Sequence, residues 1–99
     1  MTETTSELDR QVVAAIPQLA TTAGHRRRTL IRATRRSAMR KIASGKTDAD
    51  QIAAEVMEDL KADPAASAIL TIIAIAVLSG LVQWIVKRLL DNWFAEGST

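Results

Sequence analysis

The chain contains no cysteine, one histidine and three aromatic residues among its 99 residues. Without cysteine there is neither a disulfide framework nor a thiolate metal site, and a single histidine excludes a histidine-rich metal centre. A water-soluble core of this size usually uses more aromatic rings than three. The length allows one small domain at most.

Patterns of catalytic residues are also missing. The single histidine, His25, stands beside three arginines, where a solvated side chain is the default. Residues 44–47 read SGKT, the end of a phosphate-binding loop, but Arg40 stands where that motif requires a glycine. The acids of residues 48–59 lack the spacing and central glycine of a calcium loop. We therefore predict a protein that is not an enzyme and has no cofactor or metal.

The charges come in blocks of alternating sign, which the net charge of +2 conceals. Residues 1–24 have a net charge of −2, residues 25–46 carry nine basic groups and no acid, and residues 47–63 have a net charge of −5. Residues 64–86 carry no charge at all. Blocks of this kind indicate that opposite charges meet within the fold or that one block binds a charged partner.

The basic block has three candidate uses: internal pairing with acids, binding of nucleic acid, and binding of anionic lipid. Arginine suits phosphate groups well. No aromatic residue interleaves with the arginines, so nucleic-acid binding would depend on phosphates and show no sequence preference. A lipid-bound helix would need a broader apolar face than residues 26–43 provide. The candidate polyanion-binding residues are Arg26, Arg27, Arg28, Arg32, Arg35, Arg36, Arg40 and Lys41.

The uncharged block contains a run of 21 residues, 66–86, in which Gln83 is the one strongly polar side chain. As a helix this run would be about 31 Å long, one hydrocarbon thickness of a bilayer. Basic and aromatic residues follow it, as is typical of a membrane boundary. We therefore predict a single-pass transmembrane helix with an amphipathic extension over residues 64–96. Its predicted anchors at the membrane interface are Lys87, Arg88, Trp93 and Phe94.

One face of the predicted span carries small and polar side chains. Small residues allow helices to approach closely in lipid, and Gln83 would prefer a hydrogen-bonding partner to acyl chains. This face predicts contact with a second copy of the chain or with a larger membrane protein. The residues of the predicted helix–helix interface are Ala76, Ser79, Gly80 and Gln83.

The region before the apolar run reads as short helices, and no strand is indicated. The first helix contains Ser6 and Asp9 at the spacing of a capping box, and Pro17 ends or kinks it. A basic helix from about Arg27 to Ala43 should end at Ser44–Gly45, and an acidic helix should begin at residue 47 or 48.

The basic and acidic helices are predicted to form a hairpin, with apolar residues between them and partial neutralisation of charge. Those apolar residues are Ile31, Ile42, Ile52, Val56 and Leu60. The expected fold is all-α in four segments. They are an acidic N-terminal helix and loop (1–24), the basic helix, turn and acidic helix (25–63), the transmembrane helix with its extension (64–96), and a tail (97–99).

The expected function is that of a structural or adaptor component of a larger membrane assembly. Its partners would be membrane lipid and, through the basic segment, nucleic acid or anionic lipid. A lipid-containing virion fits, with the N-terminal region in its interior or, in a cell, in the cytosol. The alternatives are a holin-like oligomeric pore former and a small accessory subunit of a bacterial membrane complex.

Overall fold

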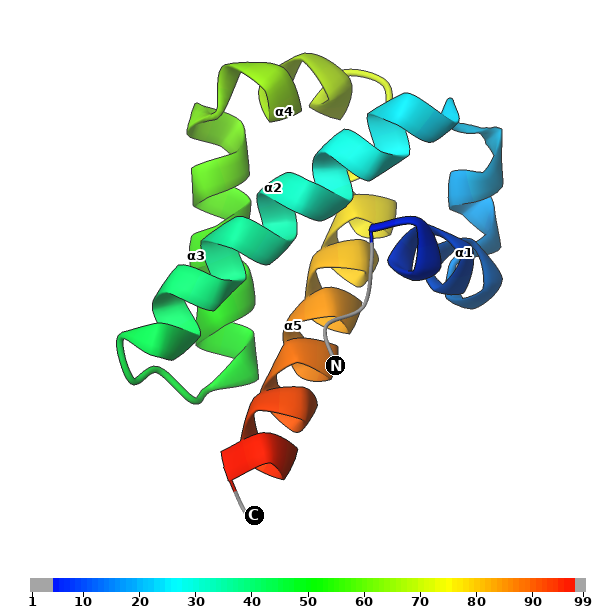
Figure 1. The fold of residues 1–99 in the computed structure, drawn as a ribbon. Coiled ribbons are helices and arrows are strands. Elements are labelled where there is room, and N and C mark those ends of the chain that lie inside the picture. The colour runs from blue at the N-terminus through cyan, green and yellow to red at the C-terminus, as the bar shows by residue number, and fades with distance from the viewer. Residues whose placement is uncertain (1–4, 98–99) are drawn as a thin grey trace.

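The computed structural model describes residues 5–97, and the side chains up to residue 93 (Figure 1). Within this range the elements are α1 (Thr5–Ala15), the 3-10 helix η1 (Pro17–Thr21), α2 (Gly24–Ala43), α3 (Ala49–Ala62), α4 (Pro64–Leu70) and α5 (Ile75–Gly97). The described residues include no strand, and the predicted all-α class is confirmed.

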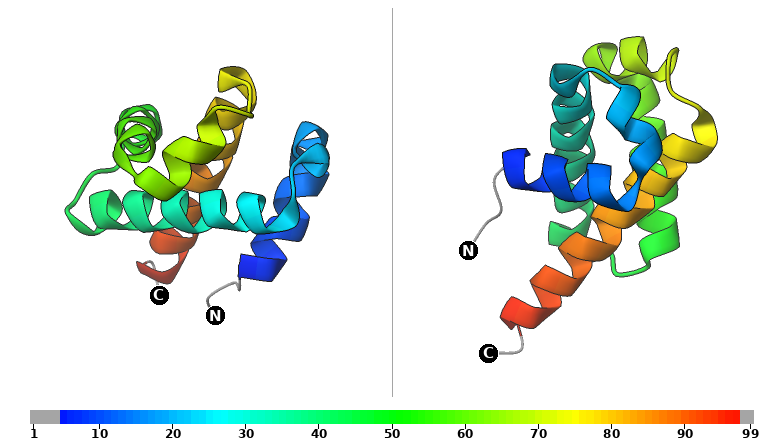
Figure 2. Two further views of the ribbon diagram at one scale, coloured as in Figure 1. Left: turned by 90° about the horizontal axis from the view of Figure 1, so that it is seen from above. Right: turned by 90° about the vertical axis from the view of Figure 1, so that its right-hand side faces the viewer.

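Three long helices form the body of the molecule. α2, α3 and α5 pack against one another pairwise, and α2 crosses α5 in the view of Figure 1. α1 and η1 lie beside the beginning of α2, and α4 packs on both α2 and α3 at the upper end in that view. Figure 2 shows from two further sides how α4 leads away from α2 into the turn that precedes α5.

Capping and turn residues set the boundaries of α2, α3 and α4. Gly45, which follows α2, has a φ of 103°, a left-handed conformation that favours glycine. The Asp48 side chain accepts hydrogen bonds from the backbone N–H groups of Asp50 and Gln51, at 3.0 and 3.4 Å, and so caps α3. Asp63 caps α4 in the same way, with Pro64 in the first helical turn.

The hairpin of α2 and α3 buries the apolar residues that the sequence pattern places between the two helices. All five are buried, and all except Ile42 are completely inaccessible to solvent. The hydrophobic core continues from this hairpin into α1, α4 and α5. Helices from both sides of residue 64 therefore contribute to one core.

The predicted transmembrane helix over residues 64–96 is wrong as a continuous element. The segment divides into α4 and α5, which a turn at residues 71–74 separates. No helix of the described part of the chain is both long enough and apolar enough to cross a bilayer. The physical reason for the difference is that α5 has protein partners: it packs against α2 and α3. Its residues Leu78, Leu81, Val82, Ile85 and Val86 are at most 1% exposed.

We predict that Leu81→Ala lowers the free energy of unfolding by about 2–5 kcal/mol, because it leaves a cavity at a fully buried position. The control is Ile75→Ala, on the same helix but 63% exposed, which should cost less than about 0.5 kcal/mol. Chemical denaturation followed by circular dichroism measures both changes. Similar losses for the two variants would contradict the observed burial of α5.

Candidate polyanion-binding surface

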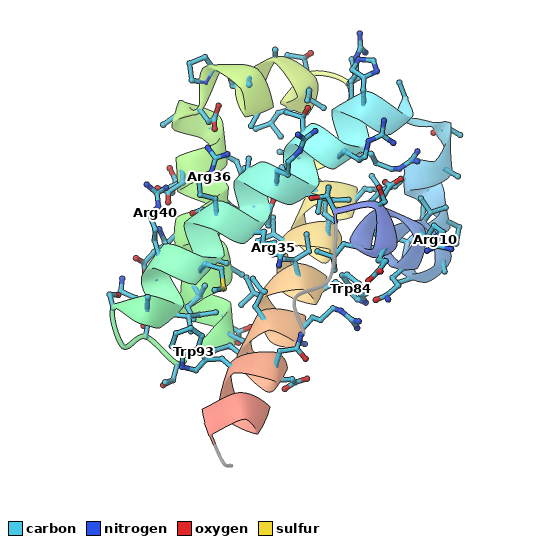
Figure 3. All side chains as sticks on the ribbon, in the orientation of Figure 1. Arg10, Arg35, Arg36, Arg40, Trp84 and Trp93 are labelled. Carbon is cyan, nitrogen blue, oxygen red and sulfur yellow. The ribbon has the colours of Figure 1, made fainter. Side chains whose placement is uncertain are left out.

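The solvent-facing side of α2 carries a row of arginines. Arg32, Arg36 and Arg40 follow one another at intervals of four residues, so each lies about 6 Å along the helix from the last. All three side chains are exposed, and we name this row the arginine stripe. Figure 3 shows Arg36 and Arg40 on the outer side of α2, whereas Arg35 lies toward α5. Arg26, near the beginning of α2, is also exposed.

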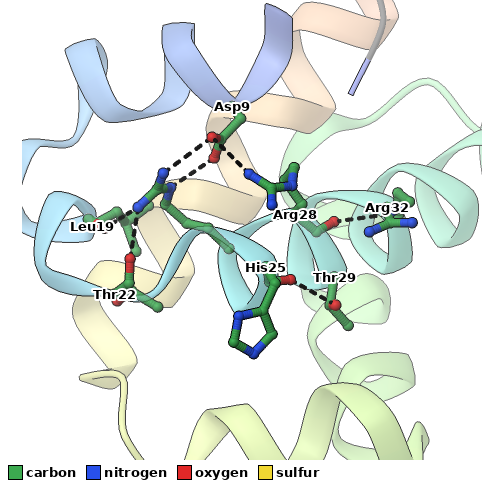
Figure 4. Close-up of polar contacts among 8 residues, drawn as sticks. Asp9, Leu19, Thr22, His25, Arg28, Thr29 and Arg32 are labelled. Carbon is green, nitrogen blue, oxygen red and sulfur yellow. Dashed lines mark hydrogen bonds and ion pairs between the residues drawn. The ribbon is translucent and has the colours of Figure 1, made fainter. Parts of the chain in front are cut away.

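Arg27 has an internal role. Its guanidinium donates two hydrogen bonds to the Asp9 carboxylate, at 2.6 and 3.1 Å, and Nη1 donates to the carbonyl oxygens of Leu19 and Thr22 at 3.3 and 2.6 Å (Figure 4). Both charged side chains are largely buried. Arg28 approaches the same carboxylate at 3.9 Å. One arginine thus joins α1 and the η1 segment to α2.

The hydrogen bonds from Arg27 lower the pKa of Asp9 below its ordinary value, and the charges of Arg27 and Arg28 act in the same direction. Burial opposes this shift but does not cancel it. The same contact raises the pKa of Arg27. The pair is therefore fully charged at neutral pH.

Lys41 and Lys46 pair with acids across the α2–α3 hairpin. Lys41 Nζ lies 2.5 Å from Asp59 Oδ2, and the Ser37 hydroxyl donates to the same oxygen at 2.6 Å. These bonds, first from Lys41 and then from Ser37, lower the pKa of Asp59. Lys46 forms an ion pair with Glu55. The predicted internal use of the basic block therefore holds for these two lysines.

The structure thus divides the eight candidate polyanion-binding residues into two groups. Arg27, Arg28 and Lys41 face acids, and the half-buried Arg35 interacts within the chain. Arg26 and the arginine stripe make no ion pair with an acid among the described residues, although Arg40 is close enough to Asp59 to help lower its pKa. The surface that remains open to a partner is this second group.

An open groove runs beside the stripe. Arg32 and Arg36 line it together with Thr29 and Ala33 of α2, and Asp63 and Ala65 contribute from the beginning of α4. Its volume is about 250 Å³, below the ~300–1,000 Å³ that is usual for a small-molecule pocket. The groove therefore suits surface contact better than enclosure of a ligand. The described residues hold no group of three or more histidine, cysteine or acidic side chains that could bind a metal ion.

The predicted helix–helix interface lies on the outer face of α5. Ala76 and Gln83 are exposed, and Ser79 and Gly80 are half-buried. A Cβ atom on Gly80 would lie 4.0 Å from Ile16 Cδ1, so Ile16, the residue that follows α1, partly covers this face. Association through these residues stays a prediction.

The predicted membrane anchors lie along the second half of α5. Lys87 is exposed, and Arg88 lies over the Trp84 ring, 5.4 Å from its centroid. Trp93 is 42% exposed. The side chain of Phe94 lies outside the described residues. These positions do not test the assignment of the four residues to a membrane boundary.

The contact between Arg27 and Asp9 is not predicted by the sequence pattern. The two residues are 18 positions apart, and the spacing of Asp9 from Ser6 suggests a capping box instead. Ser6 lies inside α1, which begins no later than Thr5, so it does not cap this helix. The one available signal is that Asp9 shares a helix with the buried Leu8 and Val12, where an unpaired carboxylate would be costly.

We predict that Asp9→Asn destabilises the protein by roughly 1–3 kcal/mol at pH 7, because it removes the charge partner of a largely buried arginine. The pKa of Asp9 is lower in the folded state, so its contribution is complete above the ordinary carboxyl pKa and is lost as the pH falls through the folded pKa. The difference in unfolding free energy between the two proteins should therefore shrink below about pH 4. A difference that stays constant between pH 7 and about pH 2.5 would contradict this assignment.

Two neighbouring residues at the end of α2 provide a matched comparison. Lys41→Gln should lower the free energy of unfolding by about 1 kcal/mol, because Lys41 is bonded to Asp59 and is mostly buried. Arg40→Gln removes the same charge from an exposed side chain and should change stability by less than about 0.5 kcal/mol. Thermal and urea unfolding check both values. A larger loss of stability for Arg40→Gln than for Lys41→Gln would contradict the assignment of the internal ion pair to Lys41.

Comparison with known proteins finds no family model, no curated protein and no solved structure that matches this chain. The function therefore has to be argued from the positions and charges of the side chains.

Proposed function

We propose that this protein is a non-enzymatic adaptor that binds a phosphate-bearing polyanion through the arginine stripe and Arg26. The observation that carries the proposal is the division of the basic block. The fold uses Arg27, Lys41 and Lys46 in ion pairs with acids, and it leaves four arginines of α2 exposed without such a pair among the described residues.

The chemistry of the exposed group favours phosphate. A guanidinium presents a planar set of donors that matches two phosphate oxygens at once, and it stays charged at any physiological pH. Like charges at i,i+4 spacing destabilise an isolated helix. A bound polyanion would reduce the repulsion among the three arginines of the stripe. α2 carries neither an acid nor an aromatic residue other than the imidazole of His25. Binding would therefore follow the density of negative charge and would not read bases.

A larger membrane assembly, including a lipid-containing virion, is the setting we propose for this adaptor. Such an assembly offers two phosphate-bearing surfaces to the stripe, nucleic acid and lipid headgroups. Binding through the stripe does not require a membrane span. No observation on the described residues specifically favours the pore-forming alternative or the accessory-subunit alternative.

We predict that the protein binds a duplex DNA of random sequence, used as a soluble polyanion, with an affinity that falls steeply with salt. Replacing Arg32, Arg36 and Arg40 by Gln should weaken binding and reduce the log–log salt slope by about 0.9 for each phosphate that is no longer neutralised. Fluorescence anisotropy over a series of salt concentrations gives both quantities. Circular dichroism should show unchanged helicity, because all three side chains are exposed.

The control variant changes Arg10, Lys61 and Lys87 to Gln. These three exposed cations lie on α1, α3 and α5, so the net charge changes equally while the stripe stays intact. The control should keep most of the affinity and most of the salt slope. Equal losses in the two triple variants would show that net charge alone governs binding and would reject the stripe as the site.

A further inference from the structure

The turn between α4 and α5 exposes two large apolar side chains. Ile72 is 55% and Ile75 is 63% exposed, the highest values among the large apolar residues whose exposure the structure describes. We name these two residues the isoleucine tip. Thr71, Ala74 and Ala76 around them are exposed and uncharged, as are the outward residues of α4. The tip is therefore part of a wider surface without charge.

This uncharged surface borders the arginines. Figures 1 and 2 place α4, the α4–α5 turn and the first half of α2 at the same end of the molecule. Arg32 and Arg36 share a groove with Ala65 of α4. The acid in that groove, Asp63, already accepts hydrogen bonds from two backbone N–H groups as the cap of α4. One end of the protein thus combines exposed isoleucines with exposed arginines.

We infer that the phosphate-bearing partner is the surface of an anionic lipid bilayer, with the arginines on the headgroups and the isoleucine tip inserted between them. This inference rests on the proposed function, because it uses the same arginines. An anionic bilayer offers both chemistries that this end requires, negative phosphates and an adjoining apolar phase.

The two alternative partners, nucleic acid and a second copy of the chain, each match only part of this surface. Nucleic acid satisfies the arginines through its phosphates but offers no apolar phase to the tip. A second copy, related by a two-fold axis, would place the exposed arginines of both copies in one interface, where their like charges oppose association. Two isoleucines among small residues also fall far short of the ~800 Å² per partner that a stable protein interface buries. Binding to a bilayer requires neither a large interface nor a complementary shape.

The two features also fit the requirements of reversible attachment. A single apolar anchor binds a bilayer only marginally, and a second, electrostatic signal is needed for stable attachment. Basic residues near an anionic surface each strengthen binding about fivefold. The tip and the arginines supply one signal of each kind, so the loss of either should be measurable by itself.

The test uses the full chain and vesicles of phosphatidylcholine, with and without phosphatidylserine at about 30 mol%, in a sedimentation assay. The protein should bind the anionic vesicles and only weakly the neutral ones. Changing Ile72 and Ile75 to Ser should weaken vesicle binding roughly tenfold and leave the affinity for duplex DNA unchanged. The Arg32, Arg36 and Arg40 to Gln variant should lose affinity for both, and on the vesicles the loss should be about fivefold for each arginine that borders the tip, Arg32 and Arg36.

Met39→Ser is the matched control, since it removes an exposed apolar side chain from the second half of α2, away from the tip. It should leave vesicle binding within about twofold, in contrast to the tip variant. Equal losses in the two variants would overturn the assignment to the tip. Circular dichroism on each variant shows whether the helices persist, and the exposure of all three side chains predicts that they do.

Insertion can be observed directly because the chain has no cysteine. Ile72→Cys carrying an environment-sensitive fluorophore should become brighter and blue-shifted on anionic vesicles. The same label on Thr47→Cys, an exposed residue in the α2–α3 turn, should not change. DNA binding without vesicle binding would overturn the lipid inference alone, and loss of both would overturn the proposed function as well. Vesicle binding with no change at Ile72 would leave the arginines as the site and reject the tip.

Discussion

The burial of one face of α5 is the interaction on which the rest of the fold depends. α5 packs against both α2 and α3 through Leu78, Leu81, Val82, Ile85 and Val86. Without α5, the hairpin of α2 and α3 would not cover the apolar faces of both helices. A two-helix hairpin leaves part of each apolar stripe in water. The third helix completes the core, to which α1 and α4 also contribute buried residues.

The charges are arranged around this core according to how far each is removed from water. Arg27 and Asp9 are largely buried, and they make charge-assisted hydrogen bonds that satisfy both groups. Lys41 and Asp59 sit nearer the surface of the hairpin. The arginine stripe and Arg26 keep their hydration. Structural and exposed cations alternate along a single helix because successive residues are about 100° apart around its axis.

The end of α2 and the beginnings of α3 and α4 could be predicted from the sequence, because each of these boundaries has a local chemical signal. The beginning of α2 has none, since Ala23 makes no side-chain cap. Asp48 and Asp63 cap the helices that follow them, and Gly45 takes the left-handed conformation after α2. The apolar residues of α2 and α3 recur at the helical period, so the buried face of the hairpin could be predicted too. The contact between Asp9 and Arg27 could not, because nothing local connects residues 18 positions apart.

The apolar segment is not the continuous helix that the sequence predicts, and other helices of the chain cover one face of α5. Length and lack of charge are the same for a span in lipid and for a helix that neighbouring helices cover, and only the surroundings tell them apart. The sequence does reveal that α5 has two unlike faces, but it does not reveal which of them is covered. Small and polar residues form contacts between helices in lipid, whereas in this fold Ala76 and Gln83 are exposed and the aliphatic face forms the contact.

The antiparallel course of the α2–α3 hairpin has an electrostatic consequence. α3 begins beside the end of α2, so Asp48 and Asp50 lie at the opposite end of the molecule from Arg26. The positive end also carries the uncharged α4, which adds nothing to compensate it. The end with Arg26 is therefore locally positive, whereas Lys41 and Lys46 offset the acids at the end with Asp48 and Asp50. A negatively charged surface would turn the protein toward it before contact, which raises the association rate at low ionic strength and fades within a Debye length, about 8 Å in physiological salt.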